Sequence, residues 1–135
     1  MLKISRKVEY ALMALKYMSD RPNDERTSAR ELCQYFKIPF DTIAKVMQVM
    51  NSGQLLKSVQ GVKGGYTLNG DLGQTSFLTL HLMLEGDGKG NSCLTSSGKC
   101  ALQGNCNIIS PLERVQGRVN QYLDNLTLKE LLSDQ

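Results

Sequence analysis

Three cysteines are the residues of this 135-residue chain best suited to metal or redox chemistry. Cys93, Cys100 and Cys106 follow the pattern C-x6-C-x5-C in a segment rich in Gly, Ser and Asn. Flexible spacers let thiolates converge on one centre, but three sulfurs are one short of the usual iron–sulfur ligand set. The spacing also lacks the C-x2-C knuckle of common zinc sites. The pattern favours a metal or cluster, and it leaves open a thiol redox switch or inert cysteines.

The elements that must position these cysteines begin with a glycine-rich stretch, GVKGGYTL at residues 61–68. Gly-Gly between two β-prone runs is typical of a hairpin. Apolar periodicity and a Ser28/Glu31 capping box predict helices before it. The expected elements in chain order are helices at 5–19, 28–36 and 40–50 and strands at 54–59 and 65–68. This order predicts a mainly α fold with a small β-hairpin, a winged helix-turn-helix.

The second half of the chain is predicted to hold a helix at 76–85, the cysteine-bearing segment, and a long C-terminal helix. Ser110 as N-cap and Pro111 at the first helical position indicate where the long helix begins. An apolar stripe then recurs at spacings of three and four, through Leu112, Val115, Val119, Tyr122 and Leu126. The stripe packs on its own domain or pairs with the same helix of a second chain. Thr127 caps a last short helix.

The winged-helix order predicts where DNA would be contacted. The third helix of such a fold lies in the major groove, and the hairpin tip offers lysines and bare glycine amides to phosphates. The same residues would otherwise be an ordinary solvent-exposed helix face and turn. The expected DNA contacts are Ser28, Phe40, Asp41, Thr42, Ala44, Lys45, Lys57, Gln60, Gly61, Lys63, Gly64 and Tyr66.

Charge is unevenly distributed along the chain. Residues 1–70 hold 11 Lys and Arg against 6 Asp and Glu, whereas residues 71–135 hold 5 against 7. A basic first half suits contact with a polyanion. No apolar run approaches the length of a membrane helix, and the first residues lack the pattern of a secretion signal. We therefore expect a cytoplasmic protein that does not associate with membranes.

Several segments carry a resemblance to a known family. They are VEYALMALKYM (8–18), SARELCQYFKIP (28–39), GVKGGYTL (61–68), YLDNLTLKELL (122–132) and the three cysteines. In their order and over the whole chain they resemble the Rrf-two family of winged-helix transcription regulators, which includes IscR, NsrR, RirA and CymR. The resemblance implies a homodimer joined by its long helix, a pseudo-palindromic operator in double-stranded DNA, and an iron–sulfur cluster that tunes DNA binding.

The resemblance also implies a ligand set for that cluster. Cys93, Cys100 and Cys106 would bind it, as [2Fe–2S] in preference to [4Fe–4S]. IscR-like members add a histidine three residues after the last cysteine, where this chain has Ile109. NsrR-like members use an acidic residue before the aromatic residue of the first helix, which here is Glu9. The expected fourth ligand is therefore Glu9 of the partner subunit.

Three further positions are interpreted from the family pattern or from their place in the chain. The arginine that usually precedes the first wing glycine is Gln60 here. The family has a small core residue at the position of Cys33, which implies that Cys33 is buried and structural. His81, in the middle of an expected helix, is interpreted as a structural side chain with satisfied hydrogen bonds.

These observations give one hypothesis for the whole chain. Residues 1–72 form the DNA-binding domain, 73–108 a helix and the cluster loop, and 109–135 the dimerisation helix and a C-terminal helix. The function is a homodimeric transcription regulator whose DNA affinity follows an iron–sulfur cluster that senses redox state, nitric oxide or iron supply. The alternative is a cluster-free repressor of the same fold that depends on thiol oxidation or zinc. No arrangement of catalytic residues is recognisable, so we do not expect an enzyme.

Overall fold

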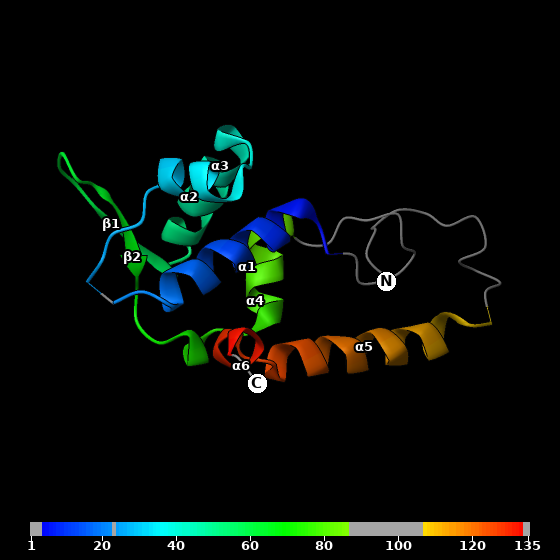
Figure 1. Cartoon of the computed structure of the whole chain (residues 1–135). Coiled ribbons are helices and arrows are strands. Elements are labelled where there is room, and N and C mark those ends of the chain that lie inside the picture. The colour runs from blue at the N-terminus through cyan, green and yellow to red at the C-terminus, as the bar shows by residue number, and fades with distance from the viewer. Residues whose placement is uncertain (1–3, 23, 87–106, 134–135) are drawn as a thin grey trace.

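The computed structural model describes residues 4–22, 24–86 and 107–133. Their elements are, in chain order, α1 (Arg6–Ser19), α2 (Ala29–Phe36), α3 (Phe40–Ser52), β1 (Leu56–Val59), β2 (Gly65–Leu68), the short 3-10 helix η1 (Leu72–Gln74), α4 (Phe77–Glu85), α5 (Ile109–Asn125) and α6 (Leu128–Leu132). The predicted fold class, mainly α with one β-hairpin, is confirmed. Figure 1 shows α2 and α3 above α1 and α4, with α5 extending along the lower side.

Local capping chemistry sets where most of the helices begin. The hydroxyls of Ser5, Ser28, Ser76 and Thr127 each accept a hydrogen bond from a backbone N–H in the first turn of the helix that follows. A hydroxyl at this position satisfies an N–H group that has no partner within the helix. The predicted starts of α1, α2, α4 and α6 are confirmed.

One predicted helix start is wrong. The long helix α5 begins at Ile109, and its N-cap is Ile108, which makes no side-chain capping hydrogen bond. The N–H of Leu112 donates to the carbonyl of Ile108 over 2.9 Å, which places Ser110 and Pro111 inside the first turn. Proline is tolerated there because N–H groups of the first turn need no helical partner. Ser110 is therefore a helical residue and not the cap.

The core forms around α1, which packs against α3, α4 and β2. Val8, Ala11 and Leu15 of α1 are fully buried and lie on one face of the helix, as their spacing predicts. Other elements contribute the remaining fully buried large side chains, which are Leu32, Ile43, Met47, Met50, Leu56, Leu80 and Leu128. Burial of these apolar side chains is the main favourable term that holds the elements together.

The hairpin pairs β1 and β2 in an antiparallel register that runs from Leu56 opposite Leu68 to Val59 opposite Gly65. Thr27, just before α2, extends the pairing: Thr27 and Tyr66 exchange two backbone hydrogen bonds of 2.9 Å. A Cβ added to Gly65 would lie only 2.9 Å from the Thr27 carbonyl oxygen, so this close approach requires glycine. The wing is thereby fixed to the start of α2.

A second backbone bridge joins α4 to the C-terminal helices. The N–H of Phe77 donates to the Leu126 carbonyl over 2.8 Å, and the N–H of Leu128 donates to the Thr75 carbonyl over 2.9 Å. Beyond this junction α5 projects away from the body of the molecule (Figure 1), and Leu123 is its one buried residue. Within the described residues, most of α5 therefore lacks a packing partner.

Two side chains differ from expectation. Cys33 is a free cysteine that is only partly buried at the edge of the core, because α2 presents its neighbour Leu32 to the interior instead. The ring of His81 stacks near Phe77, with centroids 6.4 Å apart, but its buried Nδ1 has no hydrogen-bond partner among the described residues. Within that part of the chain, the hydrogen bond expected for this nitrogen is therefore not found.

Candidate nucleic-acid interface

Helix α3 separates an apolar face from a polar one. Ile43, Val46 and Met47 are buried, whereas Asp41 and Lys45 are exposed and Thr42 and Ala44 are half-buried. Phe40, at the first helical position, keeps 43% of its surface exposed. Its ring lies 5.7 Å from the guanidinium of Arg30 on α2. All five residues predicted on this helix therefore lie at the start of α3, where side chains can reach a groove.

The wing presents its predicted residues on strand β1 and at the tip of the hairpin. Lys57, Gln60, Gly61 and Lys63 are exposed, and Val62 between them is fully exposed. The tip and α3 lie on the upper side of the molecule in Figure 1. Basic side chains on an exposed hairpin beside a helix suit contact with the phosphate backbone.

One expectation about the tip fails on geometry. The N–H of Gly64 donates to the carbonyl of Gly61 over 2.9 Å, so this amide is not free for a phosphate. A Cβ on Gly64 would lie 2.8 Å from the Val59 carbonyl oxygen, which shows that glycine is required for the tight turn itself. Gly61 adopts a φ of 123°, a conformation that L side chains rarely adopt.

The two remaining predicted contacts are Ser28, the N-cap of α2, and Tyr66, in strand β2 of the wing. The Ser28 hydroxyl caps α2 by accepting from the Glu31 N–H over 3.0 Å. Tyr66 is half-buried against the core, and both of its backbone polar groups are paired with Thr27. The structure thus gives both residues a role in holding α2 and the wing together.

A polar network holds the start of α2 against α1. Arg21 donates to the buried hydroxyl of Thr27 over 3.1 Å and makes an ion pair with Glu31. The Tyr17 hydroxyl donates to the same carboxylate over 2.5 Å, and this hydrogen bond, together with burial, raises the pKa of Tyr17. Arg21 also pairs with Glu25 over 2.7 Å, which lowers the pKa of Glu25. The network therefore fixes the position of α2 relative to α1.

Two further cations at this interface, Arg26 and Arg30, were not predicted from the sequence. Arg26 donates to the Lys63 carbonyl over 3.1 Å and so adds a guanidinium to the wing. Arg30 lies beside Phe40. Both belong to the excess of basic residues in the first half of the chain, but only the fold shows that they lie next to the predicted contacts.

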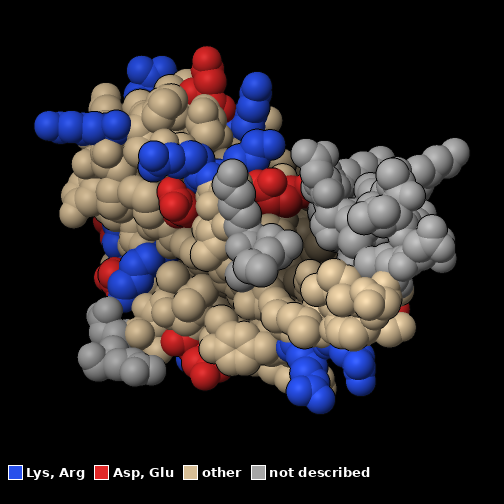
Figure 2. Space-filling view, turned by 90° about the vertical axis from the view of Figure 1, so that its right-hand side faces the viewer, with Lys and Arg blue, Asp and Glu red and all other residues tan. Residues whose placement is uncertain are grey.

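Figure 2 shows how charge is arranged on one side of the molecule. Lys and Arg side chains gather over the upper part of that face, with some Asp and Glu side chains among them, and a second group of Lys and Arg lies at the lower edge. The cations of α5 are Arg114 and Arg118.

The predicted cysteine ligands Cys93, Cys100 and Cys106 lie outside the described residues. Glu9 is described: it lies in the first turns of α1, its side chain is 48% exposed, and its carboxylate lies 3.5 Å from the guanidinium of Arg6. Among the residues that the structure describes, no group of three or more His, Cys, Asp or Glu could hold a metal ion.

Comparison with known proteins decides the family. Residues 4–134 match the profile of the Rrf2 family, described as "Iron-dependent Transcriptional regulator". The chain belongs to the Rrf2 family. It is therefore a DNA-binding transcription regulator and not an enzyme. No helix within the described ranges of this Rrf2 protein is long and apolar enough to cross a membrane.

Individual relatives agree with this assignment. A protein of Aquifex aeolicus named as an HTH-type transcriptional regulator is 27% identical over 129 residues, which cover 93% of this chain and 88% of that protein. The fold matches CymR, the global cysteine regulator of B. subtilis, with a TM-score of 0.74 at 22% identity, covering 99% of this chain and 100% of that one. It matches T. potens IscR with a TM-score of 0.68 at 21% identity, covering 97% of this chain and 86% of that one.

Proposed function

We propose that this Rrf2 regulator acts in the cytoplasm as a homodimer that places α3 in the major groove and the wing on the adjacent backbone. The observation that carries the proposal is the solvent-facing side of the start of α3, with Phe40, Asp41 and Lys45 exposed, beside a basic wing that Thr27 fixes to α2. Direct contacts from α3 would specify sequence, and Lys57, Lys63 and Arg26 would supply affinity through phosphates.

The homodimer rests on α5. Its N-cap Ile108 is 52% exposed, and its residues Val115 and Tyr122 are 58% and 67% exposed, although all three side chains are large and apolar or aromatic. Such a stripe along a helix that projects from the body is expected to be buried by the same helix of a second chain. A two-fold dimer would present two α3 helices to two half-sites, and this explains the proposed pseudo-palindromic operator.

We further propose that Cys93, Cys100 and Cys106 hold an iron–sulfur cluster, with Glu9 of the partner subunit as fourth ligand. The donor set suits such a group: three thiolates and a carboxylate supply four ligands. Glu9 is available, because an exposed i,i+3 pair such as Arg6–Glu9 is weak. When bound, the cluster would supply a centre that responds to oxidants, nitric oxide or iron supply.

Contacts among the described residues connect the end of α4 to the recognition helix α3. The cysteine-bearing segment follows α4 in the sequence, and the Glu85 carboxylate at the end of α4 accepts a hydrogen bond from the hydroxyl of Ser5. Ser5 is also the N-cap of α1, and α1 packs directly on α3. A displacement of the end of α4 would therefore move α1, and through α1 it would change the orientation of α3.

The second candidate is a cluster-free repressor of the same fold that senses thiol oxidation or binds zinc. It is favoured by the likeness to CymR, whose B. subtilis form is named a global cysteine regulator and whose Staphylococcus aureus form was also solved oxidized. The latter matches with a TM-score of 0.72 at 23% identity. Ile109 in place of the histidine ligand of IscR-like members also fits this candidate.

Purification without oxygen, followed by a visible spectrum and iron and sulfide analysis, separates the two candidates. A cluster gives a brown protein with iron matched by sulfide, whereas zinc and disulfides are colourless. Glu9→Gln is expected to alter the cluster spectrum or its stability to oxygen. The matched control Glu113→Gln removes an exposed carboxylate from α5 and is expected to leave the spectrum unchanged. A colourless protein after anaerobic reconstitution would eliminate the cluster.

A further inference from the structure

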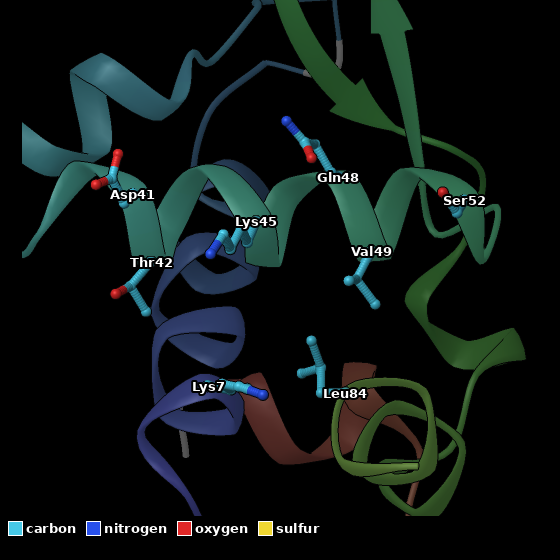
Figure 3. Close-up of a pocket in the computed structure, with 8 residues that line it drawn as sticks. All are labelled: Lys7, Asp41, Thr42, Lys45, Gln48, Val49, Ser52 and Leu84. Carbon is cyan, nitrogen blue, oxygen red and sulfur yellow. The ribbon is translucent and has the colours of Figure 1, made fainter.

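A pocket of about 620 Å³ lies on the flank of α3. Figure 3 shows α3 forming one wall, with Lys7 of α1 and Leu84 of α4 on the opposite side. The volume is within the range of about 300–1,000 Å³ that is typical of small-molecule sites. Thr42 and Lys45, two of the predicted DNA contacts, line this pocket.

The inner part of the pocket is apolar. Val49 is half-buried and Leu84 is only 8% exposed, and Figure 3 shows their side chains pointing toward one another across the cavity. An apolar pair at this depth gains from contact with hydrocarbon or an aromatic ring rather than with a phosphate group. A DNA backbone would not fill this part of the pocket.

The rim is polar and carries more positive than negative charge. Lys7 and Lys45 are exposed, and neither makes an ion pair with another residue in the part of the chain that the structure describes. Asp41 is the carboxylate among the lining residues, and Thr42 and Gln48 add hydrogen-bonding groups. Two lysines at the mouth of an apolar cavity favour an anionic head group.

We propose that this pocket binds a small organic anion with an apolar body, such as an aromatic or aliphatic carboxylate, and that the ligand competes with DNA. Its anion lies between Lys7 and Lys45, and its apolar part lies between Val49 and Leu84. Because Lys45 and Thr42 serve both ligands, an occupied pocket removes them from DNA. This competition rests on the proposed function, whereas the binding of the anion does not.

The first test is a titration of the full chain, without DNA, with anilinonaphthalene sulfonate as probe. Methyl resonances report where the probe binds. The methyl groups of Val49 and Leu84 are expected to shift with saturation at one probe per chain. Val62, which is fully exposed on the wing, serves as the internal control for non-specific binding to apolar surface. Shifts confined to Val62, or none at Val49 and Leu84, would overturn the proposal.

Matched variants test the two halves of the pocket. Lys7→Gln is expected to weaken probe binding about threefold to fivefold, since one exposed cation is lost. Lys37→Gln, at an exposed lysine outside the pocket, is expected to leave binding unchanged. Val49→Phe fills the cavity and is expected to weaken binding by more than about tenfold. Equal probe affinity in Lys7→Gln and Lys37→Gln would contradict the proposed anion site.

Competition is then measured with a DNA fragment selected from a random pool. Saturating probe is expected to raise the dissociation constant for DNA in the wild type and to have no effect in Val49→Phe. Unchanged DNA affinity with the pocket occupied would overturn the competition. A chain that selects no DNA would instead refute the proposed function, and the methyl titration would still decide the pocket.

Discussion

Gly65→Ala should detach the wing from the start of α2. The new Cβ would lie 2.9 Å from the Thr27 carbonyl oxygen, 3.1 Å from the Thr27 carbonyl carbon and 3.3 Å from the Ser28 nitrogen. These are backbone atoms, so movement of a flexible side chain cannot relieve the clash. Relief of the clash lengthens or breaks the two 2.9 Å hydrogen bonds between Thr27 and Tyr66. At about 0.5–1.5 kcal/mol each, their loss lowers the free energy of unfolding by about 1–3 kcal/mol.

Urea unfolding measures this change, and amide hydrogen exchange at Thr27 and Tyr66 locates it. Gly117→Ala is the matched control, because its Cβ would meet no atom of the described residues within 4 Å. In the interior of α5 this control is expected to stabilise the chain by about 0.5–1 kcal/mol. DNA affinity should fall in Gly65→Ala, since the wing lysines lose their fixed position. A free energy of unfolding within about 0.5 kcal/mol of wild type, with unchanged amide exchange, would show that Gly65 is not needed to hold the wing against α2.

Three further predictions concern DNA contact, dimerisation and pH. Lys63→Gln is expected to reduce the salt dependence of DNA binding by about one phosphate contact, seen as a slope change of about 0.9 in a log–log plot; an unchanged slope would remove Lys63 from the interface. Val115→Asp is expected to raise the dimer dissociation constant, measured by sedimentation, at least about 30-fold, because an unpaired carboxylate is costly in an apolar interface. Gln121→Asp, on another face of α5, is the control. A dimer that Val115→Asp leaves unaffected would place the interface elsewhere. The pKa of Tyr17 is raised above its ordinary value of 10.0, so the stability that it contributes is present below that pH and is lost as pH rises through the folded-state pKa. Tyr17→Phe should therefore lose less stability at alkaline pH than the wild type. Equal losses in the variant and the wild type would contradict the hydrogen bond from Tyr17 to Glu31.

The sequence predicted those parts of the fold that depend on neighbouring residues. Ser28 and Thr127 are predicted as N-caps because a glutamate follows each of them three residues on, and each accepts a hydrogen bond from the N–H of that glutamate. Ser110 satisfied the same pattern and failed. Its two preceding residues take helical or near-helical backbone, so the helix begins before the serine.

Features that depend on distant residues could not be predicted. The need for Gly65 arises from Thr27, which lies far away in sequence and bridges to Tyr66. Arg26 joins the wing through the Lys63 carbonyl. The pocket beside α3 is assembled from α1, α3 and α4, and no local pattern marks its residues. Periodicity could not predict that Glu9 and the three cysteines form one ligand set. That role is implied by the family resemblance, and it remains a prediction.

We propose that the state of an iron–sulfur cluster on Cys93, Cys100 and Cys106 sets the DNA affinity of this regulator. The most direct test is the dissociation constant for a selected operator fragment, measured without oxygen on loaded protein and on the same sample after iron chelation. Visible absorption of each sample reports the cluster. We predict a change of about fivefold to 150-fold between the two states, the usual range for coupling between sites. A protein that takes up no cluster, or the same DNA affinity in both states, would contradict control of DNA binding by a cluster.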